Sequence, residues 1–237
     1  MVEYADGLAG KAQMPQLIDR RTSVDVIFDH LYDRITKLEL LPGEKISEAE
    51  IAASFGVSRQ PVRDAFSRLA NLDLLLIRPQ KATEVRRFST REITKSRFVR
   101  ASVEAAVLRL AAAACDGRGA TRLEHELAAQ KQVVVAGDYA AFGRLDYQFH
   151  KILCEIANAE FAFEVIATEK SKVDRLCLLS LEQENRMPLL LEDHRAIAQA
   201  VIAGRPEDAV AAGMEHLSRL DATIAAVSAS NAGFFDP

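Results

Sequence analysis

Cysteine is scarce in this sequence. Of 237 residues only Cys115, Cys154 and Cys177 carry a thiol, and no two of them have CxxC spacing. An odd number of cysteines without paired spacing gives no disulfide framework. We therefore expect three reduced thiols that pack between helices.

Long apolar runs are also absent. No stretch approaches the ~20 residues that a helix needs to cross a bilayer. The first residues contain no apolar core of a signal peptide. We therefore expect a cytoplasmic protein that has no membrane partner.

Neither sign of charge dominates. The chain has 30 Lys and Arg against 34 Asp and Glu, a formal net charge of −4, which argues against indiscriminate binding to polyanions. The balance changes locally, because residues 59–87 hold seven basic side chains and three acidic ones, a charge of +4. If the protein binds nucleic acid, we expect the contact in this segment.

Three helices are predicted in the first third of the chain. Apolar residues with helical spacing span residues 24–38 and end before a Pro-Gly turn. Ser47 and Glu50 form a capping box for a short helix that ends at Gly56. Ser58 is the expected N-cap of a third helix, which has a proline in its first turn.

Two extended stretches follow these helices. Residues 74–77 are apolar, residues 78–81 have turn composition, and residues 83–88 are again extended, which predicts a β-hairpin. Three helices followed by a two-stranded ribbon are typical of a winged helix-turn-helix. We place this domain at residues 21–88, behind a flexible tail at residues 1–20.

The remainder of the chain indicates helices only. No sheet, fixed-period repeat or low-complexity block interrupts it. The sequence therefore predicts a mainly α protein with an all-α helical bundle at residues 89–228 and a tail at residues 229–237. Gly117 and Gly119 are expected to break the first of these helices, at about residues 89–115, and the next helix ends at Val135. The later helices are expected at about residues 138–156, 161–182, 189–203 and 207–227.

The third helix has the features of a DNA-recognition helix. In a helix-turn-helix the second helix enters the major groove, and its first residues meet the base edges. Arg59 and Arg63 lie one turn apart near that end, beside Gln60. The planar guanidinium matches the O6 and N7 acceptors of guanine, or it binds phosphate. Lys81, at the tip of the hairpin, could reach the backbone or a neighbouring groove.

A longer stretch carries a family resemblance. LPGEKISEAEIAASFGVSRQPVRDAFSRL, from Leu41 to Leu69, closely resembles the DNA-binding domain of GntR-family transcriptional regulators, and the resemblance covers about residues 24–88. It implies a double-stranded DNA operator as partner. The DNA contacts that we predict are Ser58, Arg59, Gln60, Arg63, Gln80 and Lys81.

Two positions depart from that family's pattern. Ala49 occupies a position where many members carry a DNA-contacting arginine, which would weaken a phosphate contact or change operator preference. Ala82 replaces the frequent glycine of the wing. Neither change affects the expected fold.

The bundle contains a candidate metal-binding quartet. Asp146 and His150, in LDYQFHKIL, are four residues apart and project from one face of a predicted helix; His194 and His216 lie on later helices. Each could be a core residue with a satisfied hydrogen bond. Together, one carboxylate and three imidazoles also match a mononuclear site for Zn²⁺, Ni²⁺, Mn²⁺ or Fe²⁺. The spacing leaves both interpretations open.

A second resemblance favours the metal. VRASVEAAVLRLAA, LDYQFHKIL, LEDHRAIAQAVIAG and AAGMEHL are similar to successive helices of the FCD domain, the effector domain of the FadR-type GntR branch. The similarity covers about residues 90–225. It implies one divalent metal ion per chain, held by Asp146, His150, His194 and His216.

The same resemblance gives Arg100 a role. It matches an arginine that points toward the metal cavity, where it would clamp a carboxylate whose oxygens also reach the metal. The alternative is a surface salt bridge to Glu104, four residues further along the helix. We expect the clamp, and we expect Cys154, one turn after His150, to be a packing residue.

These features predict a transcription factor and not an enzyme. A homodimer would place two recognition helices on a two-fold operator, and a small organic acid bound at the metal would release it, as expected of a repressor. Three alternatives remain: a metal-sensing regulator, a regulator with a structural metal and a bulky acyl effector, and a metal-dependent hydrolase. The hydrolase would leave the DNA-binding domain unexplained.

Overall fold

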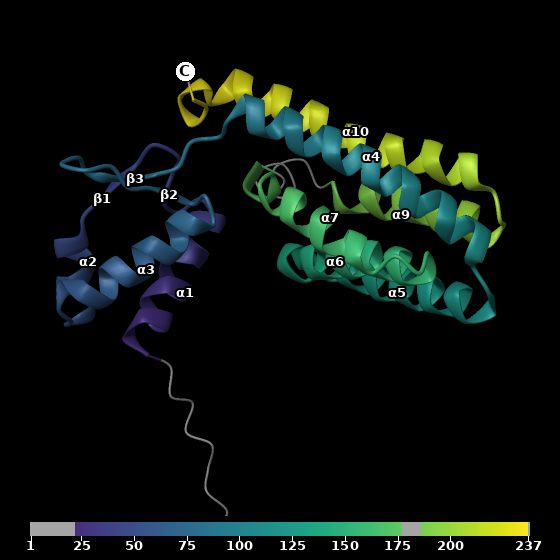
Figure 1. The fold of residues 1–237 in the computed structure, drawn as a ribbon, viewed down its shortest axis with the longest axis horizontal. Coiled ribbons are helices and arrows are strands. Elements are labelled where there is room, and N and C mark those ends of the chain that lie inside the picture. Colours follow the sequence, from purple (N-terminus) through teal and green to yellow (C-terminus); the bar gives the residue numbers. More distant parts are fainter. Residues whose placement is uncertain (1–21, 177–185, 237) are drawn as a thin grey trace, which may run out of the picture.

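The protein consists of two domains joined by a short connection. The computed structural model describes residues 22–176 and 186–236. Three helices and a small sheet form the amino-terminal domain, and a long helix leads from this sheet along the carboxyl-terminal helical bundle (Figure 1). The predicted tail at residues 1–20 and Cys177 lie outside the described residues.

The amino-terminal helices begin at capping residues. Thr22 and Asp25 form a full capping box for α1 (Ser23–Thr36). The Ser47 hydroxyl accepts from the Glu50 N–H at the start of α2 (Glu48–Phe55), and Gly56, at φ 64°, ends that helix. Ser58 is the N-cap residue of α3 (Arg59–Asn71), although its side chain makes no capping hydrogen bond. The three helices enclose an apolar core that includes Ile27, Leu31, Ile35, Val62, Phe66 and Leu69.

A three-stranded antiparallel sheet completes this domain. Its order is β1-β3-β2, formed by β1 (Lys45–Ile46), β2 (Leu75–Leu76) and β3 (Thr83–Val85). The predicted hairpin pairs Leu75 with Val85. The sequence analysis missed β1, because two residues between a turn and a cap are too few to show a period of two. The strand β3 ends at Val85, three residues before the predicted end.

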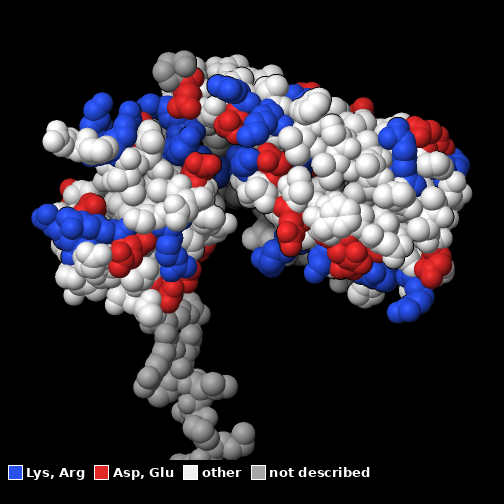
Figure 2. Space-filling view, in the orientation of Figure 1, with Lys and Arg blue, Asp and Glu red and all other residues white. Residues whose placement is uncertain are grey.

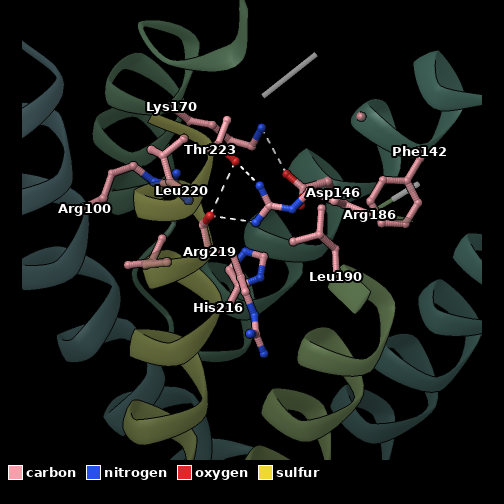
Figure 3. Close-up of a pocket in the computed structure, with 12 residues that line it drawn as sticks. Arg100, Phe142, Asp146, Lys170, Arg186, Leu190, His216, Arg219, Leu220 and Thr223 are labelled. Carbon is pink, nitrogen blue, oxygen red and sulfur yellow. Dashed lines mark hydrogen bonds and ion pairs between the residues drawn. The ribbon is translucent and has the colours of Figure 1, made fainter. Parts of the chain in front are cut away.

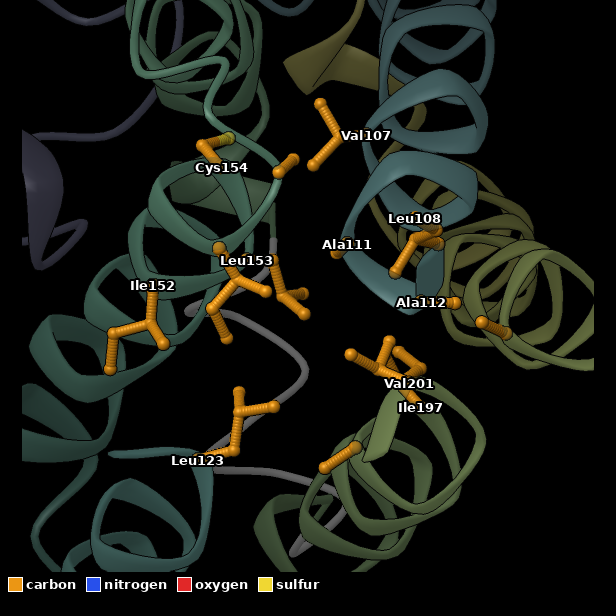
Figure 4. Packing of buried hydrophobic residues seen from close by; sticks show 14 of the residues in the cluster. Val107, Leu108, Ala111, Ala112, Leu123, Ile152, Leu153, Cys154, Ile197 and Val201 are labelled. Atoms are coloured by element: carbon orange, nitrogen blue, oxygen red, sulfur yellow. The ribbon is translucent and has the colours of Figure 1, made fainter. Parts of the chain in front are cut away.

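The bundle contains six long helices in the described residues. They are α4 (Thr90–Ala114), α5 (Gly117–Ala136), α6 (Tyr139–Ile156), α7 (Phe161–Ser171), α9 (Met187–Ile202) and α10 (Pro206–Ser230). Leu108 from α4, Leu153 from α6 and Val201 from α9 meet in its core (Figure 4). Large apolar side chains from several helices are thus removed from water together, which is the main favourable contribution to folding.

Four helix boundaries differ from the prediction. Gly117 and Gly119 do not break the chain but lie in the first turn of α5, where the Asp116 side chain accepts from the Gly119 N–H and caps the helix. The helix α7 ends at Ser171, whereas the sequence suggested about residue 182, part of which lies outside the described residues. Met187 and Pro188 begin α9 instead of interrupting a helix, because proline costs little in a first turn, where its N–H would have no partner. The helix α10 continues to Ser230.

The described part of the predicted tail at residues 229–237 is folded. After α10 a 3-10 turn, Ala232–Phe234, leads to Phe235, which is buried and forms a parallel bridge with Phe88. Apolar side chains at a chain end can still be buried when another element covers them. Cys115 and Cys154 are free thiols, as expected. Within the described ranges, no helix is long and apolar enough to span a membrane.

Candidate functional site

The predicted DNA contacts lie on one exposed surface. Ser58, Arg59, Gln60 and Arg63 are exposed at the start of α3, and Gln80 and Lys81 are exposed in the turn between β2 and β3. Basic side chains gather at the outer end of this domain (Figure 2). The side chains of Arg59, Lys81, Lys45 and Ala49 border one surface depression, so the recognition helix and the hairpin turn are neighbours.

Local contacts hold parts of this surface in place. Arg63 Nε donates to Glu48 Oε2 at 2.9 Å, and Gln60 Nε2 donates to Asp64 Oδ1 at 2.9 Å. Both contacts are exposed, so exchanging them for a ligand costs little free energy. Gln80 adopts φ 58°, which supplies the left-handed turn residue that Ala82 does not.

The candidate metal-binding quartet meets inside the bundle. Asp146 and His150 come from α6, His194 from α9 and His216 from α10, and all four are buried. One potential ligand atom from each lies within 4.8 Å of the others. The predicted juxtaposition of these four side chains is therefore present in the fold.

Hydrogen bonds orient two of the imidazoles. His150 Nδ1 lies 3.0 Å from Glu104 Oε2, and His194 Nδ1 lies 2.8 Å from Gln130 Oε1. Gln130 donates its own amide to the carbonyl of Leu145 at 3.3 Å, which turns its oxygen toward His194. Both histidines therefore carry a proton on Nδ1 and present the lone pair of Nε2.

These Nε2 atoms have no hydrogen-bond partner within the described part of the chain, and both are buried. His194 Nε2 does lie 3.3 Å from Asp146 Oδ1, but without hydrogen-bond geometry. A buried nitrogen without a partner costs free energy, whereas the same lone pair can bind a cation. Imidazole lone pairs beside a carboxylate fit a divalent ion better than they fit a dry core.

The protonation states also suit a cation. Burial, with a further contribution from the charge of His216, lowers the pKa of His194 to about 4, although Asp146 opposes this shift. Burial alone would raise the pKa of Asp146, but Lys170 and His194 outweigh it and hold the pKa well below its ordinary value. At neutral pH this pair is a neutral imidazole and a carboxylate, the forms in which both side chains bind metal.

A cavity of about 90 Å³ adjoins the quartet. Asp146 and His216 line it, together with several cations from four helices or their ends (Figure 3). Lys170 Nζ lies 3.1 Å from Asp146 Oδ2, and Arg219 makes a forked pair with Asp193. The cationic residues of the lining are Arg100, Lys170, Arg186 and Arg219.

Arg100 lies at the cavity and also pairs with Glu104. Its Nε donates to Glu104 Oε1 at 2.9 Å, but both side chains are buried, so this is not a surface salt bridge. Burial would raise the pKa of Glu104, yet Arg100 and His150 hold it below its ordinary value. Glu104 thus contacts both Arg100 and His150, a member of the candidate metal-binding quartet.

Several residues of this site escaped the sequence analysis. Lys170 and Arg219 are ordinary polar positions of predicted helices, and Arg186 lies between two predicted helices. Gln130 lies 64 residues before its partner His194. Only Glu104 had a signal, the four-residue spacing from Arg100.

Comparisons with known proteins agree with the two kinds of domain. Residues 24–85 match the family of bacterial regulatory proteins called gntR, and residues 97–219 match the FCD domain. The HTH-type transcriptional repressor RspR of Escherichia coli K12 is 33% identical over 83% of this chain and 86% of its own length. A probable D-xylose utilization operon transcriptional repressor of Paenarthrobacter nicotinovorans is 30% identical over 91% of this chain and 93% of its own.

Solved structures share the fold. A GntR transcriptional regulator of Rhodococcus sp. RHA1 superposes with a TM-score of 0.66 at 23% identity, covering 86% of this chain and 97% of its own. Escherichia coli McbR/YncC gives 0.64 at 18% identity, covering 86% of this chain and 98% of its own. The predicted winged helix-turn-helix and FCD-like bundle are confirmed. The chain belongs to the GntR family of bacterial transcriptional regulators and carries an FCD domain behind its DNA-binding domain.

Proposed function

We propose that this regulator is a repressor that a small carboxylate releases from DNA, with one divalent ion in the quartet as part of the effector site. The observation that carries the proposal is the pair of buried Nε2 atoms, of His150 and His194, that face Asp146 without hydrogen-bond partners among the described residues. Repressor names among the relatives support the direction of the response.

The cation would be held by Asp146, His150, His194 and His216. When bound, it supplies a Lewis-acidic centre that attracts carboxylate oxygens. The chain itself contributes cations around the cavity, of which Arg100 is fixed by Glu104. An organic acid fits such a lining, because guanidinium groups bind carboxylates through paired hydrogen bonds. We assign no catalytic role to this site, since Glu104 is already engaged by Arg100 and His150.

DNA would be bound by the start of α3 and the hairpin turn. Arg59 has no ion-pair partner among the described residues. The N–H groups at the start of α3 receive no hydrogen bond from the Ser58 side chain. A base edge or phosphate can therefore meet Ser58, Arg59, Gln60 and Arg63 directly, while Gln80 and Lys81 reach the flanking backbone.

A homodimer would bring two such surfaces to one operator. Phe98 on α4 and Phe161 on α7 are 73% and 77% exposed, and Val165, one turn after Phe161, is 42% exposed. The two helices pack together, with Ser96 Oγ donating to the carbonyl of Glu169. Exposed aromatic side chains on adjacent helices are typical of a protein interface, and a second copy of the chain satisfies the two-fold symmetry of an operator.

The DNA interface is tested by alanine substitution. Arg59→Ala and Arg63→Ala should each lose about 1–3 kcal/mol of operator binding without unfolding either domain. The measurement is fluorescence anisotropy with a labelled operator, selected from random DNA by the wild-type protein. Arg205→Ala, on the exposed end of the bundle, is the matched control. Wild-type affinity in both recognition-helix variants would contradict this interface.

The metal centre is tested by a double substitution. His150→Ala with His194→Ala should abolish stoichiometric zinc binding in calorimetry, because two of the four ligands are lost. His125→Ala, an exposed histidine of α5, should bind zinc as the wild type does. Full zinc occupancy in the double variant would refute the site. If chelation alone moves the protein on or off DNA, the ion itself is the signal and the carboxylate proposal fails.

A further inference from the structure

The connection between the two domains is held by residues from far along the chain. The strand β3 ends at Val85 and α4 begins at Thr90, so only a few residues separate the DNA-binding domain from the bundle. Arg86 stays with the first domain, since its N–H donates to the carbonyl of Leu74 and its guanidinium pairs with Asp73. Phe88 is the residue at which the connection reaches the bundle.

The carboxyl-terminal segment pairs with this connection. The Phe88 N–H donates to the carbonyl of Phe234, and the Asp236 N–H donates to the carbonyl of Phe88, both at 2.8 Å. The rings of Phe88 and Phe235 lie 5.5 Å apart and are buried. Arg87 Nε also donates to the carbonyl of Gly233 at 3.0 Å. Residues 233–236 thus hold the connection through backbone hydrogen bonds and one buried ring contact.

Arg175 holds the same connection from the other side. Its Nη2 donates to the carbonyl of Arg86 at 3.0 Å, and its guanidinium lies over the ring of Phe88, 4.8 Å from the centroid. The side chain is only 6% exposed, and its Nη1 has no hydrogen-bond partner in the described part of the chain. Burial, with the nearby charge of Arg86, lowers the pKa of Arg175 to about 10, so the group stays charged at neutral pH.

A short path joins Arg175 to the effector cavity. Lys170, five residues earlier, lines the cavity and pairs with Asp146. The Val173 N–H donates to the carbonyl of Lys170, and the Leu176 N–H donates to the carbonyl of Val173, so backbone hydrogen bonds connect residues 170–176. Val173 and Leu176 are buried in one apolar cluster with Phe88 and Phe235. Lys170 Nζ also pairs with Asp174 Oδ1 at 2.9 Å, so a change at the Lys170 ammonium acts on the residue next to Arg175.

We propose that Arg175 and residues 233–236 form an interdomain clamp, which holds Phe88 in the connection between the two domains. We propose further that the segment 170–176 acts as a lever: cation binding at Asp146 displaces Lys170, and this displacement changes the contact of Arg175 with Phe88. The clamp follows from the contacts alone, whereas the lever rests on the proposed cation site. A cation on Asp146 repels the ammonium of Lys170, because the two like charges compete for one carboxylate. The Lys170 end of the lever would move, and the Arg175 end would loosen or tighten its hold on Phe88.

The clamp is tested with a proline at position 236. Asp236→Pro removes the N–H that binds the Phe88 carbonyl, whereas Asp236→Ala keeps it. Phe235 has φ −101° and ψ 151°, a conformation that a residue before proline adopts readily. In hydrogen exchange of the full-length protein, we expect the Phe88 amide to exchange about tenfold faster in the proline variant than in the alanine variant. Equal rates would overturn the clamp.

The lever is tested by comparing zinc-loaded and chelated protein. In the wild type, zinc should change the exchange rate of the Phe88 amide by about fivefold or more. Arg175→Met should remove this response while zinc affinity in calorimetry stays within about threefold of the wild type. Arg109→Met is the matched control, because Arg109 also joins two elements but pairs with Glu207 on α10. It should retain the response.

Two results would overturn the lever. One is a wild type that binds zinc without any change at Phe88, and the other is an Arg175→Met protein that responds as the wild type does. If the wild type binds no zinc, the proposed metal centre fails instead. The lever is then tested with the Lys170→Met variant in chelator. Its Phe88 amide should exchange about fivefold faster than that of the wild type in chelator, and an unchanged rate would refute the lever.

Discussion

At the scale of single residues, the nitrogen through which each imidazole is hydrogen-bonded decides which nitrogen faces the candidate cation site. Gln130 and Glu104 bind Nδ1 of His194 and His150, so Nε2 of each faces the cation site. Such supporting hydrogen bonds fix both the tautomer and the direction of a metal ligand. The proposed cation binding would therefore depend on the Gln130 amide and the Glu104 carboxylate as much as on the histidines themselves.

The buried His194 should make the metal-free protein sensitive to acid. Its pKa is about 4 in the folded protein against an ordinary value of 6.5, because burial disfavours the imidazolium. Between these values the unfolded chain binds a proton that the folded chain does not, so lowering the pH favours unfolding. From this group we expect a loss of about 2 kcal/mol of unfolding free energy between pH 7 and pH 5.

Urea unfolding in chelator at both pH values measures this loss. His194→Gln has no titrating group at this position and should show a pH dependence smaller by that amount. His125→Gln removes an exposed histidine and should keep the wild-type dependence. If His194→Gln loses as much stability as the wild type, the buried neutral imidazole is not the cause.

At the scale of elements, two helical glycines have opposite surroundings. Gly213 lies where α10 approaches α4, and a Cβ there would collide with Cδ1 of the buried Leu108. A Cβ at Gly143, in α6, would meet no atom within 4 Å. The close packing of α10 on α4, which brings His216 to the quartet, therefore needs glycine at position 213. The packing of α6 has no such need at position 143.

Alanine substitution at both glycines separates packing from helix propensity. Gly143→Ala should gain about 1 kcal/mol of unfolding free energy, because alanine favours the helix. Gly213→Ala has the same gain in propensity, but overpacking against Leu108 should leave it about 1 kcal/mol less stable than the wild type. Thermal and urea unfolding of the two variants measure the difference. Equal stabilisation in both would show that α10 can move away without cost.

At the scale of the whole molecule, a single substitution should abolish the proposed dimer without unfolding the chain. Phe161→Glu should give a monomer, because a carboxylate would be buried without a partner in the interface. Its operator affinity should fall at least about tenfold, since one half-site contact is lost. Val135→Glu, at an 83% exposed position on α5, is the control and should remain dimeric.

Light scattering gives the oligomeric state of both proteins. The wild type and Val135→Glu should have twice the chain mass of 26.1 kDa. A dimeric Phe161→Glu protein would place the interface elsewhere, and a monomeric wild type would remove the two-fold model of operator binding.

Much of the fold could be read from local signals. Ser47, Gly56 and Asp138 stand at helix ends because a side-chain cap or a left-handed residue satisfies terminal backbone groups. These signals act over a few residues, so one sequence contains them in full. The strand β1 and the pairing of Phe88 with Phe235 lack such a signal, because both depend on partners distant in the chain.

The sequence by itself determined the helices, the hairpin, the basic recognition helix, and the one aspartate and three histidines that can bind a divalent ion. Hydrophobic periodicity and capping act within each segment, so they need no knowledge of the fold. Only the tertiary structure decided that Gln130 and Glu104 orient the imidazoles, that Lys170 pairs with Asp146, and that the end of the chain holds the interdomain connection. Those contacts arise when helices pack, and packing brings together side chains that share no pattern along the chain.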